Sequence, residues 1–470
     1  MSGAASRWSS GLAFYLATIG AAVGLGSIWR FPYLVGTQGG SAFIVVFVVA
    51  CVAIAIPLLA AEFLIGRRAR THPAQAAGVV AVAAGGSRIW NVIGVLGTIA
   101  TFLIISYYTL IAGWVLAYAW RCASGRLVGA TPAALQADWR AFLADPWQMA
   151  AWYVTFLLLL GVISARGVER GLEVVNRWRA PLLFGLLMIL VGYALATGDV
   201  QRGLTFAFAP DFSRIDAEVM LTAVGQAFYA TGVGMAMMIA YGAYAPADSS
   251  LLRSATLIAL SILTVSVLAS VIVFPLVFRF GLDPAQGPDL VFLVLPAAFA
   301  QMPGGQLFGT LFFVLLVLAA LTPSMAGIEP VVAFFEQKVG LRRPTAVATT
   351  ISATGIVGLG SLLSFNVAAD WRPLGAIPRF ADRTFFDVID YVTSNMLLPV
   401  GALATAVFVG WRLPAAVLDE GFAHQPDIAR IILHQQDVHV GLGCGDHGVY
   451  SLSPGSNGLT VIAGSVKWKQ

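Results

Sequence analysis

The sequence predicts an all-α integral membrane protein, an inverted five-plus-five helix repeat in which spans one and six are broken. Of the 470 residues, 59% are hydrophobic and 11% are charged, and the mean hydropathy is +0.84, which excludes an ordinary soluble domain. Several apolar segments reach about 18 residues, the length that crosses a bilayer. The first and the sixth of these segments contain Gly-x-Gly interruptions, at Gly24–Gly26 and at Gly232–Gly234.

The first interruption lies in the run Gly20-Ala21-Ala22-Val23-Gly24-Leu25-Gly26-Ser27-Ile28-Trp29-Arg30 of the first apolar segment. Glycine costs about 1 kcal/mol relative to alanine in a helix interior. Unpaired backbone in lipid costs several kcal/mol more, so a break at bilayer depth is tolerated only where it lines a cavity inside the protein. Secondary transporters hold a substrate and its coupling ions at such breaks.

The second interruption, Thr231-Gly232-Val233-Gly234-Met235, lies in the sixth apolar segment. Spans one and six occupy corresponding positions in two five-span halves, and because five is odd the halves run in opposite directions. Paired breaks at matching positions favour a midplane binding site between inverted repeats. The alternative is that these glycines only permit close helix packing, as small residues do in membranes.

The apolar stretches define ten spans by their length and hydropathy. In order along the chain, these are 10–35, 41–66, 90–120, 149–166, 171–197, 217–245, 254–280, 304–337, 345–365 and 385–411. The segment 282–303 is partly apolar but is punctuated by proline and glycine, which predicts a structured external loop that dips toward the site. Residues 412–470 contain no span and form a polar C-terminal tail of unknown role.

Short loops on one side are rich in arginine, for example after spans two and eight, which places that side and the N-terminus in the cytoplasm of a plasma (inner) membrane. The net charge of +4 is spread over these loops and indicates no nucleic-acid partner. The three cysteines do not form a disulfide framework. His434, His439, Cys444 and His447 in the tail match no zinc spacing, so an altered C-terminus without essential function is favoured over a metal site.

Several motifs occur in order over residues 7–411. They are AVGLG-x-x-x-RFPY (22–33), Gln38-Gly39-Gly40-x-Ala42-Phe43, Pro57-x4-Glu62-x3-Gly66-Arg67, Tyr107-Tyr108, Gly225-Gln226-x-Phe228-Tyr229, and Leu321-Thr322 followed by Glu329-Pro330. In these motifs the chain resembles the neurotransmitter:sodium symporter family, in particular its bacterial amino-acid transporters. The resemblance implies the inverted repeat and uptake of a small molecule coupled to Na⁺, not an enzyme. Members usually have further spans, which 412–470 lacks, and a homodimer is one assembly left open.

The resemblance places the substrate between the two breaks, against spans three and eight. Backbone amides of Gly24 to Gly26 and the hydroxyl of Tyr108 would receive a carboxylate. Monoamine carriers of the family have aspartate at the position of Gly24, so the glycine favours an amino acid. The implied substrate-binding residues are Ala22, Gly24, Leu25, Gly26, Ile104, Tyr108, Tyr229, Thr231, Gly232, Met235, Ser324 and Gly327.

Two of these residues bear on the size of the substrate. Met235 is flexible and Gly327 has no side chain, where bacterial relatives carry bulkier residues, which favours a roomier pocket. We therefore expect a large apolar or aromatic amino acid.

The resemblance also implies two gates. Arg30 and Asp390 would form an external pair over the aromatic lid Tyr229, although Arg30 could instead extend to the outer interface. Arg7, Trp8 and Tyr244 would belong to the inner gate, where Glu336 stands next to the family's acidic position. Glu62 is expected to brace span two against the core.

The sodium sites are only partly kept. The implied ligands are Gly20, Val23, Ala319 and Thr322 for one ion, and Ala22 and Ser27 for the other. Pro323 replaces a second hydroxyl, although the carbonyl one turn earlier or Ser324 could substitute. At the first site, Ser27 replaces an asparagine, Ala230 replaces a hydroxyl residue, and the span-seven asparagine position falls near Ser261.

Chloride dependence stays open. Gln226 of the chloride region is kept, Phe47 replaces a tyrosine, and no acid lies near Val265 and Ser266.

The leading hypothesis is an ion-coupled amino-acid symporter, and the alternative is a sensor or a transport-impaired homologue with degraded sodium sites. An intramembrane enzyme is disfavoured because the spans hold no histidine, no paired carboxylates, and no nucleophile beside a base.

Overall fold

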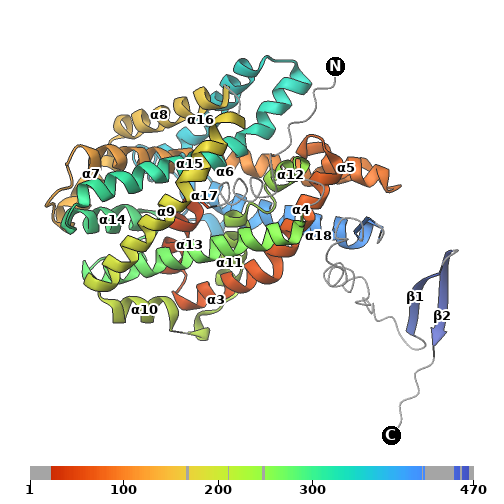
Figure 1. Ribbon diagram of the computed structural model, residues 1–470, viewed down its shortest axis with the longest axis horizontal. Helices are drawn as coiled ribbons and strands as arrows, with labels where there is room; N and C mark the ends of the chain where they lie inside the picture. Colours follow the sequence, from red (N-terminus) through yellow and green to blue (C-terminus); the bar gives the residue numbers. More distant parts are fainter. Residues whose placement is uncertain are drawn as a thin grey trace, which may run out of the picture.

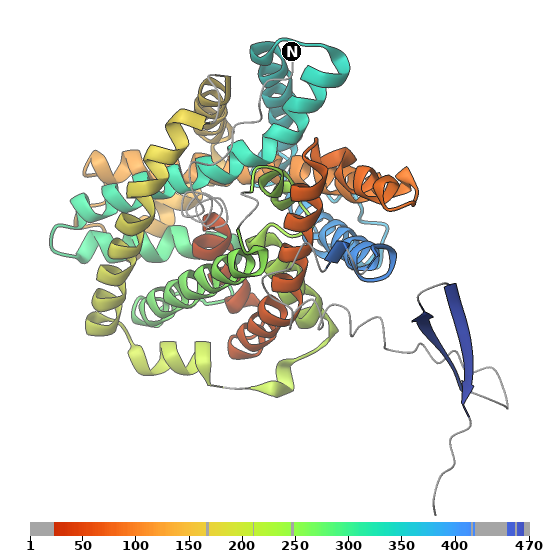
Figure 2. The ribbon, with the colours of Figure 1, turned by 45° about the vertical axis from the view of Figure 1, so that its right-hand side comes forward.

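The computed structural model describes residues 23–165, 169–209, 211–245, 249–414, 417–418, 449–455 and 458–464. Up to residue 414 the described chain is a helix bundle, and in both views its red first span lies inside the other helices (Figure 1 and Figure 2). All residues of that span from Gly26 to Gly36 are buried. The predicted all-α membrane fold is confirmed for this part of the chain.

The first half supplies spans one to five, with short 3₁₀ or π turns written as η. They are η1 (Gly26–Arg30) with α2 (Phe31–Thr37); α3 (Ser41–Ala50), η2 (Cys51–Ala55) and α4 (Ile56–Ala69); α6 (Asn91–Ala123); α8 (Pro146–Ala165); and α9 (Glu169–Thr197). The second half supplies spans six to ten. They are α11 (Ala217–Thr231) with α12 (Met237–Ala243); α13 (Leu251–Arg279); α15 (Gly305–Phe334) with η6 (Phe335–Val339); α16 (Arg343–Leu363); and α17 (Phe385–Val392), η8 (Thr393–Leu397), α18 (Leu398–Val407) and η9 (Phe408–Arg412).

The connections contain shorter elements. They are α5 (Pro73–Ala83), η3 (Arg88–Trp90), α7 (Pro132–Ala144), α10 (Val200–Phe208), η4 (Phe212–Arg214), η5 (Gly287–Asp289), α14 (Leu290–Gln301) and η7 (Pro378–Phe380). In the tail, β1 (Val449–Gly455) and β2 (Gly458–Gly464) pair as an antiparallel hairpin that the sequence analysis does not anticipate.

Among the described residues, seven helices are long and apolar enough to cross a membrane. The count becomes eight if Pro181–Thr197 and Val200–Phe208, bent by 118°, form one span. The remaining two of the ten predicted spans are one and six. Span six is interrupted between α11 and α12, and the described part of span one begins at residue 23 with a bend before its helix.

The break in span six is a left-handed turn between α11 and α12. Gly232 and Gly234 have φ of 77° and 78°, and Ala236 follows at 56°. Such angles cost a residue with a Cβ about 1–2 kcal/mol, which explains the glycines and leaves Ala236 strained. Two buried side chains satisfy the freed backbone: the N–H of Gly234 donates to Glu62 Oε1 at 2.8 Å, and Thr101 Oγ1 donates to the Met235 carbonyl at 2.5 Å.

The segment 282–303 is helical over its second part, because α14 replaces much of the expected loop. All residues of α14 from Leu290 to Phe299 are buried, against α7, α13 and α15. In Figure 1, α7 and α14 lie at one end of the bundle and α5 lies at the other. The segment also contacts span one, because Trp29 Nε1 donates to the Pro288 carbonyl at 2.8 Å.

Candidate functional site

A cavity of about 40 Å³ lies between the two helix breaks. Its walls come from spans one, three, six and eight. The lining residues are Gly24, Gly26, Thr101, Ile104, Ile105, Tyr108, Tyr229, Ala230, Met235, Met237, Pro323 and Gly327. Predicted substrate residues therefore meet here from four separate spans.

Five lining residues are absent from the substrate site predicted from the sequence: Thr101, Ile105, Ala230, Met237 and Pro323. Thr101, Ile104, Ile105 and Tyr108 follow the i, i+3, i+4, i+7 spacing of one helix face. Extending the face from Ile104 and Tyr108 by this spacing would have found the other two. For Pro323, the signal is its place one turn before Gly327 on α15.

Other predicted residues lie near the cavity without lining it. Leu25 is fully buried in the apolar core. The hydroxyl of Thr231 donates to the Ala227 carbonyl at 2.6 Å, and that of Ser324 donates to the Ala320 carbonyl at 2.8 Å, so both bond within their own helices. Gly232 serves the turn that ends α11. Ala22 and Gly20 lie outside the described residues.

The two glycines of span one are needed because other groups approach them closely. A Cβ at Gly24 would lie 3.1 Å from Tyr108 Oη and 3.4 Å from the Ala319 carbonyl oxygen. A Cβ at Gly26 would lie 3.2 Å from the ring of Tyr229. The break is therefore a narrow slot of backbone between a tyrosine hydroxyl and an aromatic ring.

The expected extra room at Gly327 is not found. A Cβ there would lie 2.7 Å from the side chain of Ile105 and 3.0 Å from that of Thr101. The glycine instead allows α15 and α6 to approach each other, as small residues do between membrane helices.

The residues of the predicted outer gate, defined here as Arg30, Asp390 and Tyr229, lie in contact with one another. Arg30 Nη2 lies 2.8 Å from Asp390 Oδ2, and the guanidinium stacks 4.5 Å from the Tyr229 ring centre. Arg30 is only 2% exposed, which rules out extension to the outer interface. The predicted contact between Arg30 and Asp390 is thus present.

Side chains from further spans complete this network. Tyr107 Oη donates to Asp390 at 2.9 Å, and Arg30 donates to Ser394 Oγ at 3.1 Å. Arg30 also donates to the Gln226 side-chain oxygen, and Gln226 Nε2 donates to the Gly26 carbonyl at 2.9 Å. The gate is therefore tied to the break of span one through Gln226, a connection that no local pattern in the sequence predicts.

The structure describes only one of the three residues predicted for the inner gate, Tyr244. Arg7 and Trp8 lie outside the described residues, and Tyr244 is 45% exposed. Glu336, expected near this gate, lies 3.4 Å from Arg343, which also pairs with Glu329 at 2.9 Å.

The donors available for a sodium ion are oxygen atoms. The Ala319 carbonyl faces Gly24, and Thr322 Oγ1 lies on the next turn of the same helix, where it donates to the Leu318 carbonyl at 3.3 Å. Ser27 Oγ is fully buried and makes no hydrogen bond with any described residue. Buried polar atoms without a partner are rare, so this hydroxyl fits a ligand role. No cluster of three His, Cys, Asp or Glu side chains suited to a metal occurs in the described part, and the four tail residues lie outside it.

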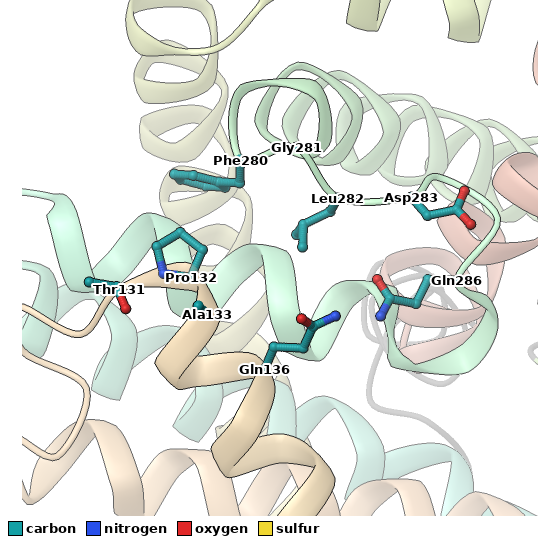
Figure 3. Close-up of a pocket in the computed structure, with 9 residues that line it drawn as sticks. All are labelled: Thr131, Pro132, Ala133, Gln136, Phe280, Gly281, Leu282, Asp283 and Gln286. Atoms are coloured by element: carbon teal, nitrogen blue, oxygen red, sulfur yellow. The ribbon is translucent and has the colours of Figure 1, made fainter.

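A larger cavity, of about 630 Å³, lies beside the start of α7 (Figure 3). It separates the start of α7 from residues 280–286, which follow α13. The side chains of Gln136 and Gln286 face each other across it. None of the predicted site residues lines this cavity, so size alone does not identify the substrate site.

Comparison with known proteins agrees with this geometry. The model described as the sodium:neurotransmitter symporter family matches residues 5–140 and 135–366. An uncharacterized sodium-dependent transporter of Bacillus subtilis, YhdH, is 36% identical over 88% of this chain and 89% of its own length. One from Haemophilus influenzae is 32% identical, over 86% and 89%. The solved structure of MhsT in complex with L-phenylalanine is similar with a TM-score of 0.83 and 36% identity, covering 92% of this chain and 99% of that one. The chain therefore belongs to the sodium:neurotransmitter symporter family.

Proposed function

We propose that this protein is a sodium-coupled symporter that imports an amino acid, with a large apolar or aromatic side chain, by alternating access. The observation that carries this proposal is a cavity bounded by both helix breaks and lined by Tyr229, on whose ring Arg30 of the Arg30–Asp390 pair stacks. Family membership supports the sodium coupling. The similarity to MhsT, whose structure holds L-phenylalanine, supports the substrate class.

The amino acid would lie with its carboxylate at the backbone amides of residues 24–26 and at the hydroxyl of Tyr108. Such amides at a helix start attract anions. Its side chain would point toward Ile104 and the break of span six. A cavity of about 40 Å³ has room for only a few water molecules, each of which needs roughly 10–15 Å³, so bound substrate requires its walls to move. Met235 and Met237 are suited to this because methionine is unbranched and flexible.

Alternating access then requires the outer gate to open. Separation of Arg30 from Asp390 and rotation of Tyr229 would connect the cavity to the outside. The external side would be the end that carries α7 and α14, and the N-terminus would be cytoplasmic. Sodium would be transported as a co-substrate. It would be bound by the carbonyls of Val23 and Ala319 and the hydroxyls of Thr322 and Ser27, since hard cations prefer oxygen ligands.

The test is uptake of radiolabelled phenylalanine, leucine and glycine into proteoliposomes, with and without an inward sodium gradient. We expect phenylalanine to accumulate when sodium flows inward. Excess unlabelled leucine should reduce this uptake more than excess glycine does. Uptake without sodium would contradict the coupling, and binding without transport would favour a sensor.

Gly24→Ala places a methyl group 3.1 Å from Tyr108 Oη and should abolish uptake. Gly185→Ala on α9 meets nothing within 4 Å and is the matched control that should transport normally.

A further inference from the structure

Pro323 interrupts the hydrogen bonding of α15 in the middle of the bundle. The helix continues on both sides of it, from Gly305 to Phe334. Proline has no N–H, so it cannot donate to the carbonyl four residues earlier, which is that of Ala319. An interior proline is the most costly residue for a helix. Its presence at this depth calls for a compensating interaction.

The released carbonyl faces the break of span one. The Ala319 oxygen lies 3.4 Å from the Cβ position of Gly24, and Pro323 Cγ lies 3.6 Å from the same point. Ala319 is fully buried, so bulk water cannot satisfy its carbonyl. A carbonyl whose lone pairs are not shared with an amide is a stronger ligand for a hard cation. Thr322 places a hydroxyl on the adjoining residue.

Pro323 also forms part of the substrate cavity, together with Gly24 and Tyr108. One residue thus contacts the cavity with its ring and exposes a carbonyl with its missing N–H. The family resemblance leads us to expect a hydroxyl at this position. Pro323 instead places a ring in the cavity wall and lacks the N–H that would bond to the Ala319 carbonyl.

We propose that Pro323 is the positioning residue of the sodium site: it frees the Ala319 carbonyl, already an implied ligand, from its helical hydrogen bond, and the stronger carbonyl ligand compensates for the missing hydroxyl. The inference rests on the proposed sodium coupling and goes beyond it. In this site the ion is bound mainly by backbone carbonyls, with the Thr322 hydroxyl beside them. Because the same ring lines the cavity, ion affinity and substrate affinity both depend on Pro323.

The test uses sodium binding to the purified full-length protein in detergent, without substrate. Binding is measured with radioactive sodium and by the sodium-dependent rise in unfolding temperature, with choline as the replacing cation. Pro323→Ala restores an N–H that can bond to the Ala319 carbonyl and supplies no hydroxyl. We expect at least a tenfold loss of sodium affinity together with a higher unfolding temperature in choline.

Two further variants make the result specific. Pro323→Ser restores the N–H but adds a hydroxyl, and should recover sodium affinity to within about threefold of the original protein, since a hydroxyl oxygen is also a suitable ligand. Pro330→Ala removes the other proline of α15, which does not line the cavity, and should leave sodium affinity unchanged.

A merely structural role for Pro323 would change stability without changing sodium affinity. The inference is overturned if Pro323→Ala binds sodium as the original protein does, or if Pro330→Ala weakens sodium equally. Should the original protein itself show no sodium response, the proposed coupling fails together with the inference. Normal sodium binding in both Pro323 variants would leave the coupling intact and refute only the role of Pro323.

Discussion

Asp390→Asn keeps the shape of the outer gate and removes one of its two charges. Arg30 is 2% exposed and Asp390 is 17% exposed at the side chain, so water screens the pair poorly. Removing one partner of a buried ion pair costs about 3–5 kcal/mol. Gln226 and Ser394 still accept hydrogen bonds from Arg30, and asparagine can accept one as well. The expected cost of Asp390→Asn is therefore about 3 kcal/mol, the lower end of this range.

This cost falls on the closed gate, because water reaches Arg30 when the gate opens. A shift of about 3 kcal/mol corresponds to roughly a hundredfold change in the closed-to-open ratio. We expect the cavity to become more accessible from outside and bound substrate to leave outward faster. The same change should lower transport, because premature release competes with inward movement.

The assay is the rate at which a membrane-impermeant thiol reagent labels Ile104→Cys in a chain whose Cys444 is replaced by serine. Cys51 and Cys122 are buried and provide little background. Labelling of the Asp390→Asn chain should be at least tenfold faster. Asp387→Asn is the matched control, since Asp387 caps α17 through Thr384. Equal labelling with and without Asp390→Asn, or an equal effect from Asp387→Asn, would show that the Arg30–Asp390 charge pair does not hold the cavity closed.

Three further predictions concern stability and are measured as unfolding temperatures in detergent. Glu62→Leu leaves the buried N–H of Gly234 without its acceptor and should lower the free energy of unfolding by about 1–3 kcal/mol. Glu62→Gln keeps an acceptor oxygen and should lower it much less. Equal losses of stability in the two variants would contradict this role of Glu62. Burial raises the pKa of Asp289, in the connection between α13 and α14, to about 6, with a smaller opposing effect of Trp139. A carboxyl with a raised pKa stabilises the fold below the unfolded pKa of about 4 and loses this contribution as the pH rises through 6. Above pH 6, Asp289→Asn should therefore be more stable than the original chain by up to about 3 kcal/mol. The variant should also lack this dependence of stability on pH. Parallel pH profiles of the two chains would show that Asp289 is not responsible. Ala236→Gly relieves a φ of 56° in the span-six break and should raise stability by about 1 kcal/mol; a decrease would show that the turn is not strained.

The sequence alone determined the membrane fold and the position of both helix breaks. Apolar length and Gly-x-Gly interruptions report energies that are local to each span, namely the cost of polar backbone in lipid and of glycine in a helix. The family motifs then pointed to Gly24, Tyr108 and Tyr229, which the fold brings together. Arg30 and Asp390 were likewise expected to meet, and they do.

Which side of each helix faces the cavity follows from how the helices pack against one another. A membrane helix such as α6 is apolar all round, so hydrophobic patterning does not distinguish its lipid face from its buried face. Three features depend on how neighbouring helices are rotated and how closely they approach. They are the place of Thr101 and Pro323 in the cavity wall, the hydrogen bonds that link Arg30 through Gln226 to Gly26, and the filling of the space at Gly327 by Ile105. These are contacts between residues far apart in the chain, and no local energy term specifies them.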